Sequence, residues 1–148
     1  MQTSDREIGV TATLPAPVEL VWKVWTQPEH IAHWWGPNGF TNDIHQMDVV
    51  PEGVWRLTMK GPDGQTYPNK TVFQEIDPFR KIVMLHHNPR YLATILFEPS
   101  ENETLLDWKM LFETAELFNT VVRVFKADQG LQQNVEKLQA YLLQLQAE

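Results

Sequence analysis

Cysteine is absent from this 148-residue sequence, and serine is nearly absent. Without cysteine the chain can form no disulfide, thiolate nucleophile, zinc–thiolate site or iron–sulfur cluster. The two serines, Ser4 and Ser100, lie in a polar N-terminal segment and in an expected turn, and neither belongs to a G-x-S-x-G motif. No glycine-rich phosphate loop is present either. These absences argue against nucleophilic catalysis and against nucleotide binding.

Basic residues are scarce as well. Twelve Lys and Arg against nineteen Asp and Glu give a net charge of −7. The nearest approach to a basic cluster, Arg80-Lys81 with Arg90 nearby, is too sparse to follow a phosphate backbone, so nucleic acid is not an expected partner. No apolar run approaches the ~20 residues of a membrane span, and the N-terminal segment lacks the apolar stretch of a signal peptide. We therefore expect a cytoplasmic protein without a membrane partner.

Hydrophobic residues are plentiful, at 43% of the sequence, which is incompatible with a disordered chain. A chain of this length can bury roughly 70% of the surface that it exposes when unfolded. We expect one domain over residues 1–148, with a substantial core and room for a cavity.

The N-terminal third predicts one strand and two short helices. Residues 7–14 alternate between apolar and small polar side chains, the pattern of a half-buried strand. Pro17 then opens a helix as its first residue, and Pro28 opens a second that runs through Trp34. Gly36 stops the second helix. Trp22, Trp25, Trp34 and Trp35 of this segment are expected to close one end of the core.

From residue 40 onward the pattern changes to strands separated by turns. The clearest hairpin joins Lys60 to Gln65, because Pro62 presets the turn and Gly64 can adopt a positive φ. The predicted strands span residues 41–50, 53–60, 66–77, 80–87, 91–98 and 104–113.

The C-terminal segment predicts one long helix over residues 115–146. Its apolar positions recur at spacings of 4, 3, 4 and 3, which defines one apolar seam. The seam consists of Leu131, Val135, Leu138, Leu142 and Leu145. Gln139 is predicted to face solvent, and Gly130 to be a weak point or a place of close approach. Because so long an amphipathic helix needs an apolar surface, we predict an α+β domain in which a curved antiparallel sheet wraps around this helix.

Several local motifs resemble the family related to the activator of the heat-shock-protein-90 ATPase, within the START/SRPBCC superfamily. The motifs are Ala16-Pro17 with Val21-Trp22, Trp25 to Glu29, Trp34 to Pro37, Asp48 with Pro51 to Arg56, Asp63-Gly64, Glu75-Ile76 and Thr104. The resemblance implies the helix-grip fold, with about seven strands around the C-terminal helix. It also implies a cavity between sheet and helix, because members of the superfamily bind apolar or amphipathic small molecules there.

Three functions stay open at this point, because a fold alone does not select among them. The first is non-catalytic binding of a small hydrophobic or amphipathic ligand. The second is a protein-interaction domain that acts on a chaperone or regulator. The third is a cyclase or hydrolase for a polyketide-like substrate.

The expected ligand wall combines apolar residues of the strands with two polar anchors, His87 and Tyr67. The full set is Trp55, Leu57, Tyr67, His87, Phe97, Trp108 and Met110. Plain packing against the helix is the alternative role for its two tryptophans. His86 and His87 are adjacent on one strand, so only one of them can face inward. Glu75 fits either face, and Asp107 with Lys109 predicts a solvated outer pair.

No catalytic residue, metal site or cofactor is expected. His30 and His33 share a predicted helix but lack a third ligand nearby in the sequence, and His86 and His87 point in opposite directions. We therefore expect the protein to bind no stoichiometric zinc.

Overall fold

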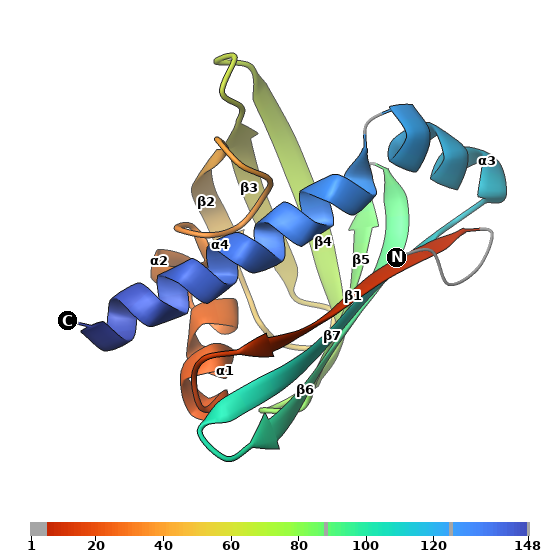
Figure 1. Ribbon diagram of the computed structural model, residues 1–148. Coiled ribbons are helices and arrows are strands. Elements are labelled where there is room, and N and C mark those ends of the chain that lie inside the picture. The colour runs from red at the N-terminus through yellow and green to blue at the C-terminus, as the bar shows by residue number, and fades with distance from the viewer. Residues whose placement is uncertain (1–5, 88, 125, 148) are drawn as a thin grey trace.

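Seven strands form one curved sheet in the order β1-β7-β6-β5-β4-β3-β2 (Figure 1). The structure is a computed structural model that describes residues 6–87, 89–124 and 126–147. Its strands are β1 (Glu7–Leu14), β2 (Thr41–Met47), β3 (Val54–Lys60), β4 (Thr66–Asp77), β5 (Lys81–His87), β6 (Arg90–Ser100) and β7 (Glu103–Phe112). Every pairing is antiparallel. The predicted sheet is confirmed, with strand ends that move by up to three residues.

Two short helices follow β1, as predicted: α1 (Val18–Thr26) and α2 (Pro28–Ile31). Pro17 is the extended N-cap of α1 and not its first helical residue. The second helix ends three residues before Trp34, and the chain then turns at Gly36 with a φ of +94°. The positive φ favours glycine at this turn, whereas the nearest atom to a Cβ at Gly36, Met59 Cε at 2.7 Å, is the end of a flexible side chain that can move aside.

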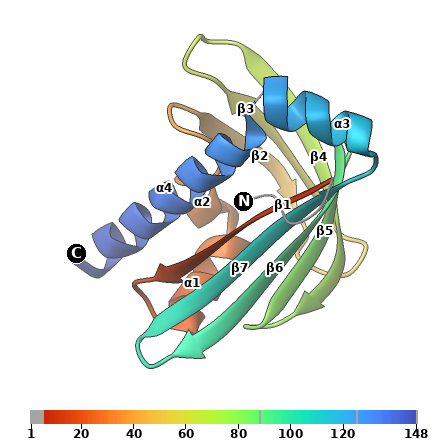
Figure 2. The ribbon, with the colours of Figure 1, turned by 45° about the vertical axis from the view of Figure 1, so that its right-hand side comes forward.

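The C-terminal segment is helical but is broken, which corrects the prediction of one helix over residues 115–146. α3 (Ala115–Asn119) continues into a π-helical turn, η1 (Thr120–Val124), and α4 (Ala127–Ala147) begins anew. Lys126, between them, has a φ of +56°, a conformation that no right-handed helix contains. The break lets the two parts serve different neighbours: Phe118 of α3 packs on Phe112, whereas α4 crosses the sheet (Figure 2).

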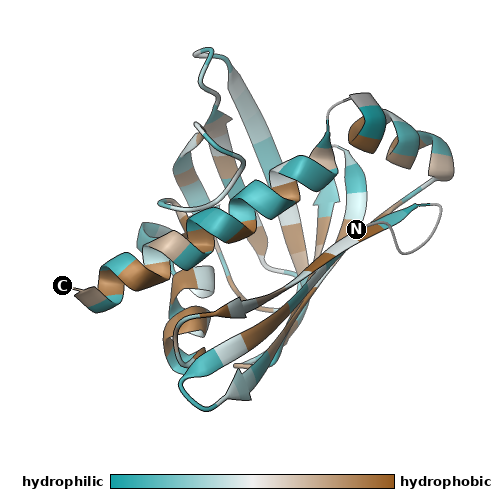
Figure 3. Cartoon of the chain, viewed as in Figure 1, coloured by the Kyte–Doolittle hydropathy of each residue, from teal (hydrophilic) through white to brown (hydrophobic). Residues whose placement is uncertain are grey.

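α4 lies over the concave face of the sheet, with its hydrophobic positions toward the strands and hydrophilic positions outward (Figure 3). Four residues of the predicted seam are buried, namely Leu131, Val135, Leu138 and Leu142. The fifth, Leu145, is half-buried. Asn134, a polar residue that the apolar seam omits, is buried beside them. Among the described residues, no helix is long and apolar enough to cross a membrane.

The outer, convex face of the sheet carries Glu75, for which the sequence allows either face, and the predicted outer pair of Asp107 and Lys109. A register shift between Phe73 and Glu75 turns Glu75 outward, where it pairs with Lys81 at 3.3 Å. Asp107 and Lys109 form the predicted outer pair, with 3.8 Å between Oδ2 and Nζ. The inner face carries mainly apolar side chains and one small cluster of polar side chains.

Candidate functional site

An aromatic network fills the space between the short helices and the sheet. Trp25 has its ring centroid 4.8 Å from that of Trp34 and 5.0 Å from that of Trp108. Trp35 in turn lies 4.9 Å from Trp55 and 5.5 Å from Trp108. Large aromatic rings in such edge-to-face and stacked contacts form a rigid wall. The tryptophans of the two strands therefore meet those of the helical segment, and three of them, Trp35, Trp55 and Trp108, line one side of a cavity.

The cavity has a volume of about 200 Å³ and lies between the inner face of the sheet and the first turns of α4. Strands β3 to β7 supply its floor, the turn after α2 supplies one side, and α4 supplies its roof. The lining consists of Trp35, Gly36, Pro37, Trp55, Leu57, Met59, Asn69, Thr71, His86, Tyr91, Trp108, Met110, Ala127, Gly130, Leu131 and Asn134. Most of these side chains are apolar, and no carboxylate is among them.

Asn69, Thr71, His86 and Tyr91 form a polar corner of the cavity. Thr71, His86 and Tyr91 are direct cross-strand neighbours on β4, β5 and β6, so the antiparallel register brings them side by side on the inner face. The His86 ring stacks on Tyr91 with centroids 4.6 Å apart. His86 Nε2 lies 2.6 Å from Asn69 Oδ1, and its Nδ1 lies 2.7 Å from the Pro89 carbonyl oxygen.

Burial sets the protonation states of the polar corner. Desolvation lowers the pKa of His86, the Pro89 carbonyl opposes that effect, and the charge of His87 adds a further lowering. Desolvation also raises the pKa of Tyr91 well above its ordinary value. Both shifts favour the neutral forms of the two stacked rings.

A neutral His86 cannot satisfy both of its contacts, because a neutral imidazole has one N–H and both partners are oxygen atoms. The amide of Asn69 is fixed by its Nδ2, which donates to the Tyr67 carbonyl at 2.9 Å. Rotating that amide would offer an N–H to His86 but would place Oδ1 against the Tyr67 carbonyl. In either orientation of the Asn69 amide, one pair of acceptor atoms in the polar corner therefore faces each other without a hydrogen between them.

Side chains of α4 hold the turn that closes the cavity. Asn134 donates to the Trp34 carbonyl at 2.7 Å and accepts from the Gly36 amide at 3.1 Å. Lys137 Nζ donates to the carbonyls of Gly36 and Pro37, both at 3.2 Å. Desolvation lowers the pKa of Lys137 in this position. The turn and the helix therefore form one rigid wall.

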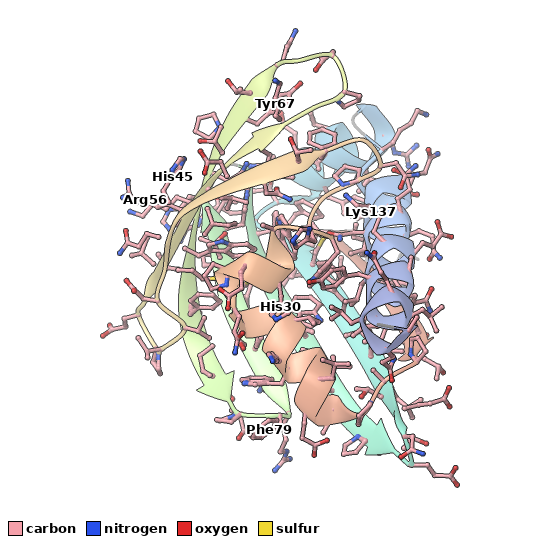
Figure 4. All side chains as sticks on the ribbon, turned by 90° about the vertical axis from the view of Figure 1, so that its left-hand side faces the viewer. His30, His45, Arg56, Tyr67, Phe79 and Lys137 are labelled. Carbon is pink, nitrogen blue, oxygen red and sulfur yellow. The ribbon has the colours of Figure 1, made fainter. Side chains whose placement is uncertain are left out.

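Four of the seven predicted ligand-wall residues line the cavity: Trp55, Leu57, Trp108 and Met110. Three do not. His87 is exposed on the outer face, because strand alternation gives the inward position to His86. Tyr67 is 41% exposed at the far end of the β3–β4 hairpin, where it contacts Phe40 (Figure 4).

Phe97, the third exception, is buried at the opposite end of the sheet. Its ring centroid lies 5.6 Å from those of both Trp22 and Trp25. It therefore belongs to the packed core beneath α1, away from the cavity.

The polar corner was the main feature missed from the sequence, apart from His86, which was weighed only as an alternative to His87. The sequence did contain a signal. Asn69, Thr71 and Phe73 are two residues apart and therefore share one face of their strand, and polar residues on an otherwise apolar face indicate a polar site within the core. The contribution of Trp35, Gly36 and Pro37 had no comparable signal, because it depends on where the turn docks on α4.

The histidines of the α2 region are engaged with an aromatic ring. His30 Nδ1 lies 2.8 Å from the Tyr141 hydroxyl, and the His33 ring stacks on Tyr141 with centroids 5.4 Å apart. Within the described part of the chain, no group of three or more His, Asp and Glu side chains could hold a metal ion.

The model of the family described as Activator of Hsp90 ATPase homolog 1-like protein matches residues 15–143. No curated protein matches the chain. Among solved structures, a Nitrosomonas europaea protein has a TM-score of 0.88 at 22% identity, with 99% of this chain and 100% of that chain covered. An Arthrobacter aurescens protein has a TM-score of 0.90 at 21% identity, with 97% and 90% covered. An AHSA1-like protein of Aeromonas hydrophila has a TM-score of 0.77 at 16% identity, with 96% and 95% covered. At these identities the structural similarity shows the fold alone.

Proposed function

Because this chain belongs to the family of Activator of Hsp90 ATPase homolog 1-like proteins, whose fold commonly binds ligands or proteins, we propose that its cavity binds a small molecule without transforming it. The ligand is apolar over most of its surface and carries one hydrogen-bonding group. The observation that supports this most is the pairing of aromatic walls with a polar corner whose hydrogen bonds are incomplete. Apolar cavities with a few convergent polar groups are the usual form of small-molecule sites.

The cavity volume limits the ligand to about one or two rings. A dry protein cavity of about 150 Å³ accommodates benzene, and this one measures about 200 Å³. A phenol or an indole fits that space, whereas a sterol or a long fatty acid does not. Burying roughly 200 Å² of such a ligand contributes about 5 kcal/mol before the entropy of association is subtracted. We therefore expect dissociation constants between about 0.1 and 1 mM for simple aromatic probes.

Binding without catalysis is favoured over a cyclase or hydrolase by the titratable groups at the site. Acid–base chemistry on a substrate needs a donor and an acceptor of matched pKa that reach the reacting atoms. No carboxylate is among the described residues that line the cavity, and the raised pKa of Tyr91 makes it a poor acid. His86 is the remaining titratable group among the described lining residues; burial lowers its pKa, and its one N–H is taken up by either Asn69 or the Pro89 carbonyl.

The test is a titration with phenol, indole, 2-naphthol and cholesterol, monitored by amide chemical shifts. Met110→Phe should fill part of the cavity and weaken binding of the aromatic probes about tenfold or more. Leu111→Phe is the matched control, because the next residue of β7 faces the outer side of the sheet. If no aromatic probe binds below about 1 mM, or if both variants bind as the wild type does, the proposal is wrong.

A further inference from the structure

The outer face of the sheet carries an apolar row that crosses five strands. Val54 pairs with Val72, Val72 with Leu85, Leu85 with Leu92, and Leu92 with Leu111. All five side chains are half-buried, and they point away from α4. A polar convex face would be the ordinary outcome for an antiparallel sheet with one face in water. Single exposed leucines are common on protein surfaces, but this row is a continuous apolar patch.

A basic row runs beside the apolar row, two residues further along each strand. Its members are Arg56 on β3, Lys70 on β4, His87 on β5 and Arg90 on β6, and all four are exposed. Arg56 is directly opposite Lys70, and His87 is directly opposite Arg90. Like charges directly opposite one another, as in the Arg56–Lys70 pair, destabilise a sheet. The arrangement is notable in a chain with a net charge of −7.

The charges of the basic row are only partly neutralised within the chain. Arg90 Nε pairs with Glu113 at 2.8 Å. Arg56 Nε donates to the uncharged amide of Gln46 at 3.0 Å, and no ion pair between described residues reaches Arg56 or Lys70. These two side chains line a hollow of about 280 Å³ together with His45 and His87. His45 and Arg56 project from the side of the sheet opposite α4 (Figure 4).

We propose that this outer face docks an acidic amphipathic α-helix of a protein partner. Neighbouring strands lie about 4.8 Å apart, so the basic row presents a nitrogen donor at roughly that interval, with formal positive charges on Arg56, Lys70 and Arg90. One turn of an α-helix rises 5.4 Å, and carboxylates at positions i, i+4 and i+7 would follow the same interval. An apolar stripe on the adjacent side of that helix would lie on the apolar row.

Other occupants fit the two rows less well. Alternate side chains of an extended strand are spaced about 6.6 Å apart, which does not match the interval of the basic row. A nucleic acid strand offers phosphates but no apolar stripe. An anionic membrane would attract the basic row, but the half-buried valine and leucine side chains do not project far enough to enter the hydrocarbon.

The length of the docked helix follows from the sheet. From β3 to β6 the basic row spans three strand intervals, or about 14 Å, which corresponds to about ten helical residues. This interaction does not involve the cavity, since the two surfaces lie on opposite faces of the sheet.

The probe is a synthetic peptide of about 18 residues, long enough to be helical alone, with glutamates on one stripe and leucines on the adjacent stripe. Its control has the same composition in a shuffled order that breaks both stripes. We expect the striped peptide to shift amide resonances of β3 to β6 and the shuffled peptide to bind at least about fivefold more weakly. Equal affinity for the two peptides, or no binding below about 1 mM, would overturn the proposal.

Two substitutions locate the interaction. Lys70→Glu should weaken peptide binding about five- to tenfold, whereas Lys60→Glu, on the same face but outside the basic row, should change it less than about twofold. Met110→Phe in the cavity should leave peptide binding unchanged. Vesicles of phosphatidylcholine and phosphatidylglycerol test the alternative partner. If Lys70→Glu lost affinity for these vesicles but kept its affinity for the peptide, the outer face would bind a membrane surface, and the proposal would be refuted.

Discussion

His86 and Asn69 lie in contact across two strands of the sheet, with 2.6 Å between Nε2 and Oδ1. The contact places an oxygen on each side of the imidazole, because Nδ1 lies 2.7 Å from the Pro89 carbonyl oxygen. Protonation would satisfy both oxygens, but burial lowers the pKa of His86 and keeps the ring neutral. The residue therefore links the stability of the protein to pH.

The sign of this linkage follows from the direction of the pKa shift. The pKa of His86 is lower in the folded chain than in the unfolded chain, where it is about 6.5. Between the two values the unfolded chain binds more protons, so the free energy of unfolding rises with pH. Its contribution is complete above about pH 6.5 and is lost as the pH falls through the folded pKa.

His86→Gln should flatten the dependence of the free energy of unfolding on pH between about pH 5 and 7, as urea titrations would measure. His87→Gln is the control, because it removes only the smaller effect that the His87 charge has on His86. It should retain most of the wild-type slope. An unchanged slope in His86→Gln would show that other groups carry the acid sensitivity.

Leu138→Ala should lower the free energy of unfolding by about 2–5 kcal/mol, because Leu138 is 0% exposed in the middle of the α4 seam. Leu143→Ala is the matched control: it makes the same change in the same helix at a side chain that is 57% exposed, so its effect should stay within about 0.5 kcal/mol. Gln139, which the seam predicts to face solvent, is a poorer control since it donates to the Thr13 carbonyl at 3.1 Å. Equal urea midpoints for the two leucine variants would contradict the orientation of α4.

Asn134→Ala should lower the free energy of unfolding by about 2–4 kcal/mol, because it leaves the Trp34 carbonyl and the Gly36 amide without their partner in a buried place. The Gly36 amide should also exchange with solvent faster. Gln133→Ala removes one exposed bond, to the Asn38 amide, and should change stability by about 1 kcal/mol or less. Similar losses in the two variants would show that the turn is not held by Asn134.

Most of the fold could be predicted from the sequence, because its strands and its long helix have periodic hydrophobic patterns. Alternation predicted strands such as β4, whose ends match, and the spacing of Leu131 to Leu142 predicted the buried side of α4. The break at Lys126 was not predicted, because lysine gives no local signal for a positive φ. On the two sides of the break, Phe118 packs on Phe112 and the α4 seam is buried against the sheet.

The candidate site was less predictable, since a cavity depends on what remains unfilled. Trp108 and Met110 both line the cavity, because alternation along β7 determines which side chains face inward, and their contact with a ligand stays a prediction. His87 was placed inward in error, because adjacent histidines leave the phase of a strand undecided until the register is known. The basic row was not predicted for a related reason. Arg56, Lys70 and Arg90 are distant in the sequence, and only strand pairing brings them into one row.

The last prediction concerns the size of the ligand. Met110→Ala should enlarge the cavity, because the Met110 side chain lines it and the rigid tryptophan wall leaves little scope for collapse. The truncation should lower the free energy of unfolding by about 2–5 kcal/mol. A ligand that fills the new space restores part of that loss, since binding to the folded state alone stabilises it.

Phenol and 4-phenylphenol therefore form a discriminating pair of probes. Wild type should prefer phenol, while Met110→Ala should bind 4-phenylphenol about tenfold more tightly than wild type does, since each additional buried CH₂-sized group contributes about 0.8 kcal/mol. Leu111→Ala, truncated on the outer face, should keep the wild-type preference. Calorimetric titration measures both affinities directly. If the order of preference were the same in all three proteins, Met110 would not set the size of the site, and the ligand would have to enter somewhere other than the space between β7 and α4.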